Sequence, residues 1–220
     1  LVFSLILFGK AVPFLPYFIY AFDRMANKGL GAGKIRFHLS AGFAHQNLEN
    51  HDELMQIYDG DAQLLNGNFH TWNMQELNLP DQNPENMRLK IRLITPARLV
   101  QHGKLVQSIS FELFVRTLLR RISLLAKIHC QSDWNVPYAE ILKNARGVHT
   151  LQDDTQWYDW TRFSSRQKRL MKLGGLVGTI VFEGDISPFL PLLALGQYTH
   201  FGKNATFGLG KYRVEIENSK

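Results

Sequence analysis

The chain has 220 residues, of which 45% are hydrophobic and 20% are charged, so it can bury an ordinary core and is not intrinsically disordered. Lysine and arginine outnumber aspartate and glutamate by 25 to 19, and the net charge of +6 favours an anionic partner over a basic one. The single cysteine, Cys130, excludes an internal disulfide framework and a zinc cluster of cysteines, and makes a reducing, intracellular setting the default expectation.

The first 39 residues predict a strand, a helix, a glycine loop and a second strand. Residues 2–8 form an unbroken apolar run, which is typical of a buried strand, and residues 13–27 predict a helix with prolines in its first turn. Residues 29–33 are rich in glycine and can adopt positive φ angles. Residues 34–39 alternate apolar and basic side chains, which predicts a half-buried strand with a basic outer face.

The apolar residues 1–22 are long enough to cross a bilayer, which makes a membrane anchor an alternative. Lys10 and two prolines interrupt the run, and the similar segment near the other end carries Glu183 and Asp185. A buried strand followed by a core helix explains both segments, so we expect no membrane partner and no signal peptide.

Residues 41–86 are rich in Asn, Gln, Asp and Pro, which predicts irregular strands and a linker. Beyond them the pattern is regular, with Ser110 as the N-cap of the longest helix, which extends to about Ile128. The predicted strands are residues 88–93, 176–182 and 212–216, together with residues 148–150 and 157–163, which are predicted to pair with each other. The other predicted helices are residues 134–144 and 188–198. The order β-α-β-β-α-β indicates an α+β, ferredoxin-like (split βαβ) domain at 87–220, preceded at 1–86 by the closing part of a similar domain and a linker.

Two segments of the chain match in order at a nearly constant offset. Residues 13–16 read PFLP and residues 33–36 read GKIR, while residues 188–191 read PFLP and residues 210–213 read GKYR. We interpret this as a duplicated unit of strand, helix, glycine loop and strand.

The glycine loops are the first candidate site. Backbone N–H groups near glycines can approach a phosphate chain while cations lie over it, although a tight helix-to-strand turn also needs glycine, and both interpretations stay open. The residues concerned are Gly202, Lys203, Gly208, Gly210, Lys211 and Arg213, with Gly31, Gly33 and Lys34 in the first copy. The sequence contains no P-loop motif, and a dinucleotide fold has the opposite order of strand and helix.

Basic side chains recur on several elements. Together they predict a groove for phosphates, although each one alone is more simply explained as part of a solvated face. They are Arg88, Lys90, Arg92, Arg98 and Lys104, and on the long helix Arg116, Arg120 and Arg121.

The segment 157–169 interleaves aromatic and basic residues, as RNA-binding surfaces do. Trp157 and Trp160 are better explained as core anchors. The polar part, Arg162, Ser164, Ser165, Arg166 and Gln167, has no role in a core and predicts RNA contact.

None of the eight histidines has the spacing of a metal site, so we expect no metal and no cofactor. His129 ends the long helix beside Cys130 and is a candidate general acid or base, the alternative being a cap on the last carbonyls of the helix.

Several separated motifs resemble one known family. They are residues 98–106 (RLVQHGKLV), 110–130 (SFELFVRTLLRRISLLAKIHC), 160–180 (WTRFSSRQKRLMKLGGLVGTI) and the final segment from Gly184 to Tyr212. The chain thereby resembles the CRISPR-associated endoribonucleases that process precursor CRISPR RNA, the repeat-processing branch of the RAMP superfamily, continuously from Met87 to Ile216.

The resemblance implies tandem ferredoxin-like domains that grip a repeat RNA. It implies metal-independent cleavage in which the 2′-hydroxyl attacks the adjacent phosphate and leaves a 2′,3′-cyclic phosphate and a 5′-hydroxyl. The family's glycine-rich loop maps onto Gly202, Gly208 and Gly210, and its basic turn onto Arg162 and Arg166. It also implies a cytoplasmic, prokaryotic setting, with other CRISPR-associated proteins or a fused reverse transcriptase and integrase as further partners.

One departure concerns the catalytic base. In many relatives a histidine in the first helix of the first domain fills this role, and the expectation is that this part would precede Leu1. His129 then has the analogous place in the second domain. The alternative function is a non-catalytic RAMP-type RNA-binding module of a CRISPR complex.

Overall fold

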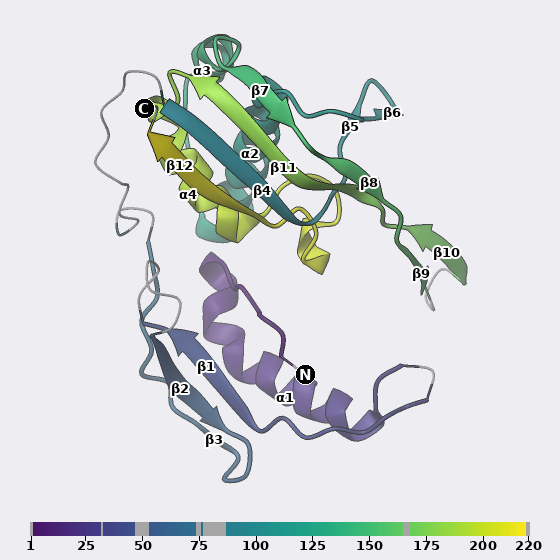
Figure 1. Ribbon diagram of the computed structural model, residues 1–220. Helices are drawn as coiled ribbons and strands as arrows, with labels where there is room; N and C mark the ends of the chain where they lie inside the picture. Colours follow the sequence, from purple (N-terminus) through teal and green to yellow (C-terminus); the bar gives the residue numbers. More distant parts are fainter. Residues whose placement is uncertain are drawn as a thin grey trace. The chain divides into compact units, whose positions relative to one another are not determined.

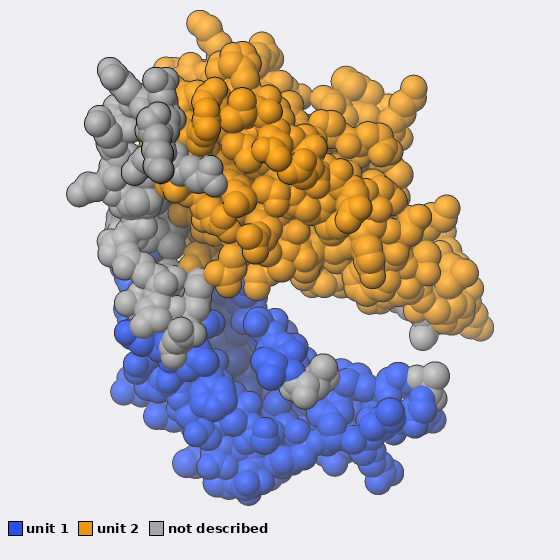
Figure 2. All heavy atoms as spheres, in the orientation of Figure 1, with its two compact units in different colours: residues 1–78 blue, residues 79–220 orange. Residues whose placement is uncertain are grey.

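The structure is a computed structural model that describes residues 2–31, 33–46, 53–73, 76, 87–164 and 168–218. The chain divides into two compact units, Leu1–Asn78 (unit 1) and Leu79–Lys220 (unit 2), coloured separately in Figure 2. Each unit is described by itself below.

Unit 2 is built on an antiparallel sheet with the strand order β12-β4-β11-β7 (Figure 1). The strands are β4 (Met87–Ala97), β7 (His149–Asp153), β11 (Gly175–Gly184) and β12 (Tyr212–Asn218). Helix α2 (Phe111–Leu125) follows β4, and helix α4 (Leu190–Thr199) follows β11. The chain therefore runs β-α-β-β-α-β with its first and third strands at the centre, which confirms the predicted ferredoxin-like α+β fold of this unit.

The helices of unit 2 cover one face of this sheet (Figure 1). Helix α2 starts as predicted, because the Ser110 hydroxyl accepts a hydrogen bond from the Leu113 N–H at 3.3 Å. It continues into a π-helical turn at Ala126–Cys130 and packs against the short helix α3 (Tyr138–Ala145). A short 3₁₀ turn, Ser187–Phe189, precedes α4.

Aromatic side chains fill the core between the helices and the sheet. The rings of Phe114, Phe201 and Tyr212 pack edge to face, with centroids 4.7 to 5.6 Å apart. Phe201 is the first residue of the glycine loop and Tyr212 immediately follows it, so both ends of the loop are held in this core.

Two hairpins are inserted into the unit. One joins β5 (Val100–Gln101) to β6 (Lys104–Leu105). The other joins β9 (Thr161–Ser164) to β10 (Arg169–Lys172) and extends beyond the end of the main sheet (Figure 1). The predicted pairing of strands 148–150 and 157–163 is wrong: β7 and β8 (Gln156–Tyr158) both pair with β11, because the long central strand offers enough ladder positions for both.

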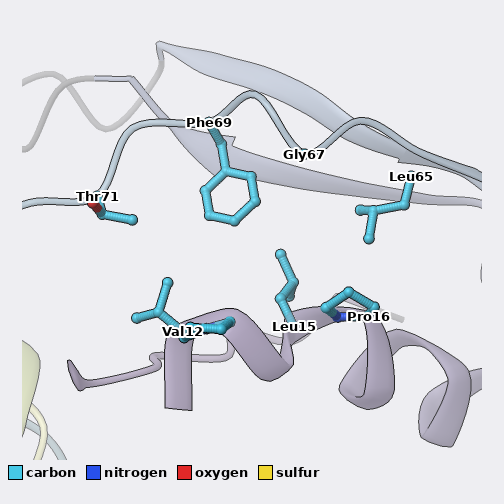
Figure 3. Close-up of a pocket in the computed structure, with 8 residues that line it drawn as sticks. Val12, Leu15, Pro16, Leu65, Gly67, Phe69 and Thr71 are labelled. Carbon is cyan, nitrogen blue, oxygen red and sulfur yellow. The ribbon is translucent and has the colours of Figure 1, made fainter. Parts of the chain in front are cut away.

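Unit 1 contains a helix and a small antiparallel sheet. A 3₁₀ turn (Gly9–Phe14) leads into α1 (Leu15–Lys28), as predicted for this proline-led helix. The sheet has the order β1-β2-β3, from β1 (Ala41–His45), β2 (Leu54–Asp59) and β3 (Leu64–Leu65). Unit 1 also contains an apolar pocket of about 310 Å³. Figure 3 shows Val12, Leu15 and Pro16 on one side of it and Leu65 and Phe69 on the other.

Two predicted strands of unit 1 are not formed. Residues 2–8 are not a strand, and Phe3 packs on Phe22 of α1 at 4.6 Å between ring centroids. Residues 34–39 form only a single bridge, Leu30 to Ile35, and Ile35 is 73% exposed. An apolar or alternating run becomes a strand only when another strand supplies its hydrogen bonds, and the sheet of unit 1 pairs neither segment. Unit 1 therefore contains the predicted helix and glycine turn but neither of the predicted flanking strands.

None of the helices in the described parts of the chain combines the length and the apolar character needed to cross a membrane.

Candidate nucleic-acid interface

The glycine loop of unit 2, residues 201–211, is fixed to the end of strand β4. The Lys203 N–H donates to the carbonyl of Arg98 at 2.8 Å, and the Gly210 N–H donates to the carbonyl of Pro96 at 3.1 Å. The Thr95 hydroxyl donates to the Gly208 carbonyl at 2.8 Å and accepts from the Lys211 N–H at 2.8 Å. The root of the loop is thus held by a continuous set of hydrogen bonds.

The three glycines of this loop have different roles. A Cβ on Gly210 would lie 1.8 Å from the Phe201 carbonyl oxygen, and one on Gly202 would lie 2.8 Å from the Arg98 oxygen. Gly208 has a φ of +81° and open space around it. Turn geometry therefore explains Gly202 and Gly210, whereas the exposed Gly208 offers backbone that a ligand can approach closely.

The β9–β10 hairpin contacts this loop through Arg162. The guanidinium of Arg162 lies 4.9 Å from the ring centroid of Phe207, a cation–π contact between two exposed side chains. On the other side of the hairpin, Phe163 and Leu170 are directly opposite each other and are 60% and 70% exposed. We call Arg162, Lys203, Phe207 and Gly208 the hairpin–loop surface.

Ser164 is the first of the polar residues after Arg162 that were predicted to contact RNA. Ser164 is buried at the end of β9, with 6% exposure, so it is not available on the surface as predicted. Ser165, Arg166 and Gln167, which were predicted to contact RNA, lie outside the described residues.

The predicted groove that combined cations of strand β4 with cations of helix α2 is not formed. Alternate residues of β4 face the core beneath α2, so Arg88, Lys90 and Arg92 point to the opposite face of the sheet. There Arg88 pairs with Glu183 at 3.0 Å, and Glu215 pairs with Lys90 at 3.3 Å and Arg92 at 3.6 Å. Much of the positive charge on this face is therefore neutralised within the sheet.

The remaining predicted cations are divided between these two faces. Arg213 stands opposite Arg92 in the strand register and so shares the open face of the sheet. Arg120 is exposed on helix α2, and Arg116 of the same helix is paired with Glu112. Arg98 donates to the Gly174 carbonyl at 2.9 Å and lies over Trp157, which is a packing role.

Arg121 and His200 meet at the inner end of the loop. Arg121 Nε donates to the Thr199 carbonyl at 3.2 Å, and its partial burial lowers its pKa. His200 is buried, and the pKa of its imidazole falls to about 4 because of burial and the charges of Lys211 and Arg121. Sequence reasoning missed His200, and the only signal was a histidine between a helix end and a glycine loop.

His129 lies in the π-helical turn that ends α2, where it is exposed next to the exposed Cys130 and Lys127. Its side chain has no hydrogen bond or ion pair to a described residue, so the alternative role as a cap on the helix carbonyls is not observed. The backbone closes the turn instead, through the N–H groups of Gln131 and Ser132, which both donate to the Ala126 carbonyl.

In unit 1, Gly31, Gly33 and Lys34 form an exposed turn closed by the Leu30–Ile35 bridge. Gly31 has a φ of +74° and Lys34 a φ of +46°. These residues belong to unit 1, whereas the hairpin–loop surface belongs to unit 2. Among the residues that the structure describes, no three histidine, cysteine or acidic side chains gather as metal ligands.

Comparison with known families gives a direct result for this region. The family model described as "CRISPR-associated endoribonuclease Cas6" matches residues 91–212, more than half of the chain. The chain belongs to the CRISPR-associated endoribonuclease Cas6 family. The Cas6 match runs from β4 to the first residue of β12 and includes the β9–β10 hairpin, the glycine loop and His200. A second family model, described as an N-terminal domain, matches residues 1–69.

Solved structures of Cas6 proteins are similar to the chain at low sequence identity. A Cas6 product complex is 18% identical, with a TM-score of 0.42, over 58% of this chain and 51% of that one. Cas6 of Thermus thermophilus is 13% identical, with a TM-score of 0.45, over 58% and 53%. A Cas6-RT-Cas1–Cas2 complex is 14% identical, with a TM-score of 0.47, over 74% and 19%. The chain spans about half the length of the separate Cas6 chains, and no curated protein matches it in sequence.

Proposed function

We propose that the chain binds CRISPR repeat RNA and cleaves it to release guide RNA. The observation that carries this proposal is the Cas6 family match over residues 91–212, which contains the whole hairpin–loop surface. The net charge of +6 is consistent with a polyanionic substrate.

The hairpin–loop surface offers the two kinds of contact that single-stranded RNA needs. Arg162 and Phe207 present a stacked cation and ring, on which an unpaired base can stack. Lys203 is exposed on the same loop and can neutralise a backbone phosphate, and the open space at Gly208 lets the backbone of RNA approach the protein closely.

Cleavage in this proposal uses the RNA's own 2′-hydroxyl and no metal ion. A general base removes the 2′-hydroxyl proton, the oxygen attacks the adjacent phosphorus, and the bond from phosphorus to the 5′-oxygen breaks. The products are a 2′,3′-cyclic phosphate and a 5′-hydroxyl, whose proton comes from a general acid. His129 is the base that we assign within this chain, at the exposed end of helix α2.

The assignment of domains is part of the same proposal. Residues 1–86 are the closing part of a first ferredoxin-like domain with a linker, and residues 87–220 are the second. Gly31, Gly33 and Lys34 of the first, and Ser165, Arg166 and Gln167 of the second, are further RNA contacts. Arg120, Arg121, Lys211 and Arg213 contribute to the positive potential.

A non-catalytic RNA-binding module is the second candidate. The observation that favours it is the isolation of His129, whose side chain has no hydrogen-bonding neighbour among the described residues to orient it as a base. In that case the hairpin–loop surface binds repeat RNA and leaves it intact.

The test incubates the full chain with end-labelled repeat RNA in EDTA. A cyclic-phosphate product that is absent with a 2′-deoxy substitution at the cut site supports cleavage by the proposed route. Cleavage of the 2′-deoxy RNA contradicts it. Binding without cleavage supports the second candidate, and His129→Ala that cleaves at the wild-type rate excludes His129 as the base.

A further inference from the structure

His200 has a backbone conformation that only glycine adopts readily. Its φ of 57° and ψ of 177° fall in a region that a side chain with a Cβ strongly disfavours. The residue is also only 8% exposed, so its ring is packed inside unit 2. A non-glycine residue kept at such a position is a strained residue, and strained residues concentrate at functional sites.

The ring of His200 lacks a partner on one side. It has a hydrogen bond with the Leu209 backbone, while Nε2 is buried without any hydrogen-bond partner among the described residues. Buried polar atoms are nearly always hydrogen-bonded, so an unpaired imidazole nitrogen points to a ligand.

The charged groups that face the ring come from two other elements and are both cations. Arg121 approaches from helix α2, and Lys211 precedes strand β12. Arg121 donates a hydrogen bond from Nε to the Thr199 carbonyl, and neither cation forms an ion pair with a carboxylate among the described residues. Partly buried cations without an anion are unfavourable, and an anion between them removes the penalty.

We propose that His200, Arg121 and Lys211 form a phosphate-binding site at the inner end of the glycine loop. The natural ligand of this site would be a phosphodiester of bound RNA, and in this respect the proposal rests on the proposed RNA-binding function. A free anion such as phosphate has the same chemistry. The site is distinct from the hairpin–loop surface, because it is built from α2, the end of α4 and the start of β12.

The site predicts that binding is coupled to a proton from solvent. Without an anion the two cations and burial hold the pKa of His200 at about 4, so its ring is neutral at pH 7. A bound phosphate reverses the local charge, moves the pKa toward its ordinary value, and lets Nε2–H donate to a phosphate oxygen. Linkage then makes affinity rise as the pH falls, by about tenfold between pH 7.5 and 5.5 if the bound imidazole returns to a pKa near 6.5.

The test measures the affinity of the full chain for an oligouridylate RNA at pH 7.5 and 5.5. This RNA is chosen because neither uracil nor a phosphodiester titrates in that range. Wild type is compared with His200→Gly, which fits the backbone, and with His200→Asn, which keeps a polar side chain that does not titrate. The matched control is His102→Gly, since His102 is also at positive φ (49°) but exposed in the β5–β6 turn. Circular dichroism verifies that each variant is folded. A second measurement, the increase in melting temperature on adding sulfate, tests whether the site binds a free anion, and the charge of sulfate is constant over this pH range.

We expect the affinity of wild type and His102→Gly for RNA to increase about tenfold toward pH 5.5, and that of both His200 variants to increase less than twofold. Equal pH dependence in all four proteins overturns the site, even where RNA binding itself supports the proposed function. If RNA does not bind at all but sulfate stabilises wild type more than the His200 variants, the anion site stands and the proposed function fails.

Discussion

The two glycine loops of the chain have similar sequences and different structures. The loop at residues 201–211 is fixed by hydrogen bonds to Thr95, Pro96 and Arg98 and continues into strand β12 of a sheet. The loop at residues 29–33 closes on itself through one bridge, and the residues after it form no ladder. Glycine spacing therefore specifies a turn, and only a neighbouring strand converts the next segment into part of a sheet.

The largest expected effect compares one glycine from each loop. Gly210 and Gly31 have similar φ angles, +68° and +74°, but a Cβ would lie 1.8 Å from the Phe201 oxygen at Gly210 and meets nothing within 4 Å at Gly31. Gly210→Ala should reduce the free energy of unfolding by about 3 kcal/mol or more, and Gly31→Ala by about 1 kcal/mol. Denaturant unfolding measures both free-energy changes. Equal losses of stability would show that the loop at residues 201–211 is not tightly packed around Gly210.

The next effect concerns the stability of unit 2 at low pH. His200 has a pKa of about 4 in the folded state, below its ordinary 6.5, so protonation favours unfolding. Its stabilising contribution is fully present above pH 6.5 and is lost as the pH falls toward 4, by on the order of 3 kcal/mol. With Trp72 of unit 1 replaced by Phe, the remaining tryptophans, Trp134, Trp157 and Trp160, all lie in unit 2. Urea unfolding followed by their fluorescence should show this loss in the chain with His200 and a smaller one when His200→Asn is added. An identical pH dependence in both proteins would contradict the role given to the buried ring.

The smallest expected effect separates free cations from paired ones. Arg162→Ala should weaken binding of repeat RNA about tenfold, because it removes a stacking and phosphate contact. Arg92→Ala should weaken binding less than threefold, because Arg92 is partly neutralised by Glu215 on the open face of the sheet. Fluorescence anisotropy at fixed salt measures both affinities. If the two losses are equal, RNA affinity depends on total charge and not on the hairpin–loop surface.

Much of unit 2 could be predicted from the sequence, because its signals are local. The alternation before Ile94, the Ser110 cap and the stripe of Phe114 and Leu118 each specify their element directly. The order of these elements then gave the ferredoxin-like topology.

The errors all concern contacts between distant segments. The partner of a strand cannot be read from its own residues, so residues 2–8 and 34–39 were assigned to sheets that do not include them. The ion pairs of Glu183 and Glu215 depend on strand register, which the sequence does not specify. Burial of His200 depends on three elements meeting, so its role appears only in the structure.

The most direct test of the central claim is hydrogen–deuterium exchange of the full chain with and without repeat RNA. Bound RNA should slow exchange in residues 161–164 and 200–211, which carry the hairpin–loop surface and His200. If bound RNA leaves exchange in both segments unchanged, RNA binds elsewhere and the interface proposed for unit 2 is wrong.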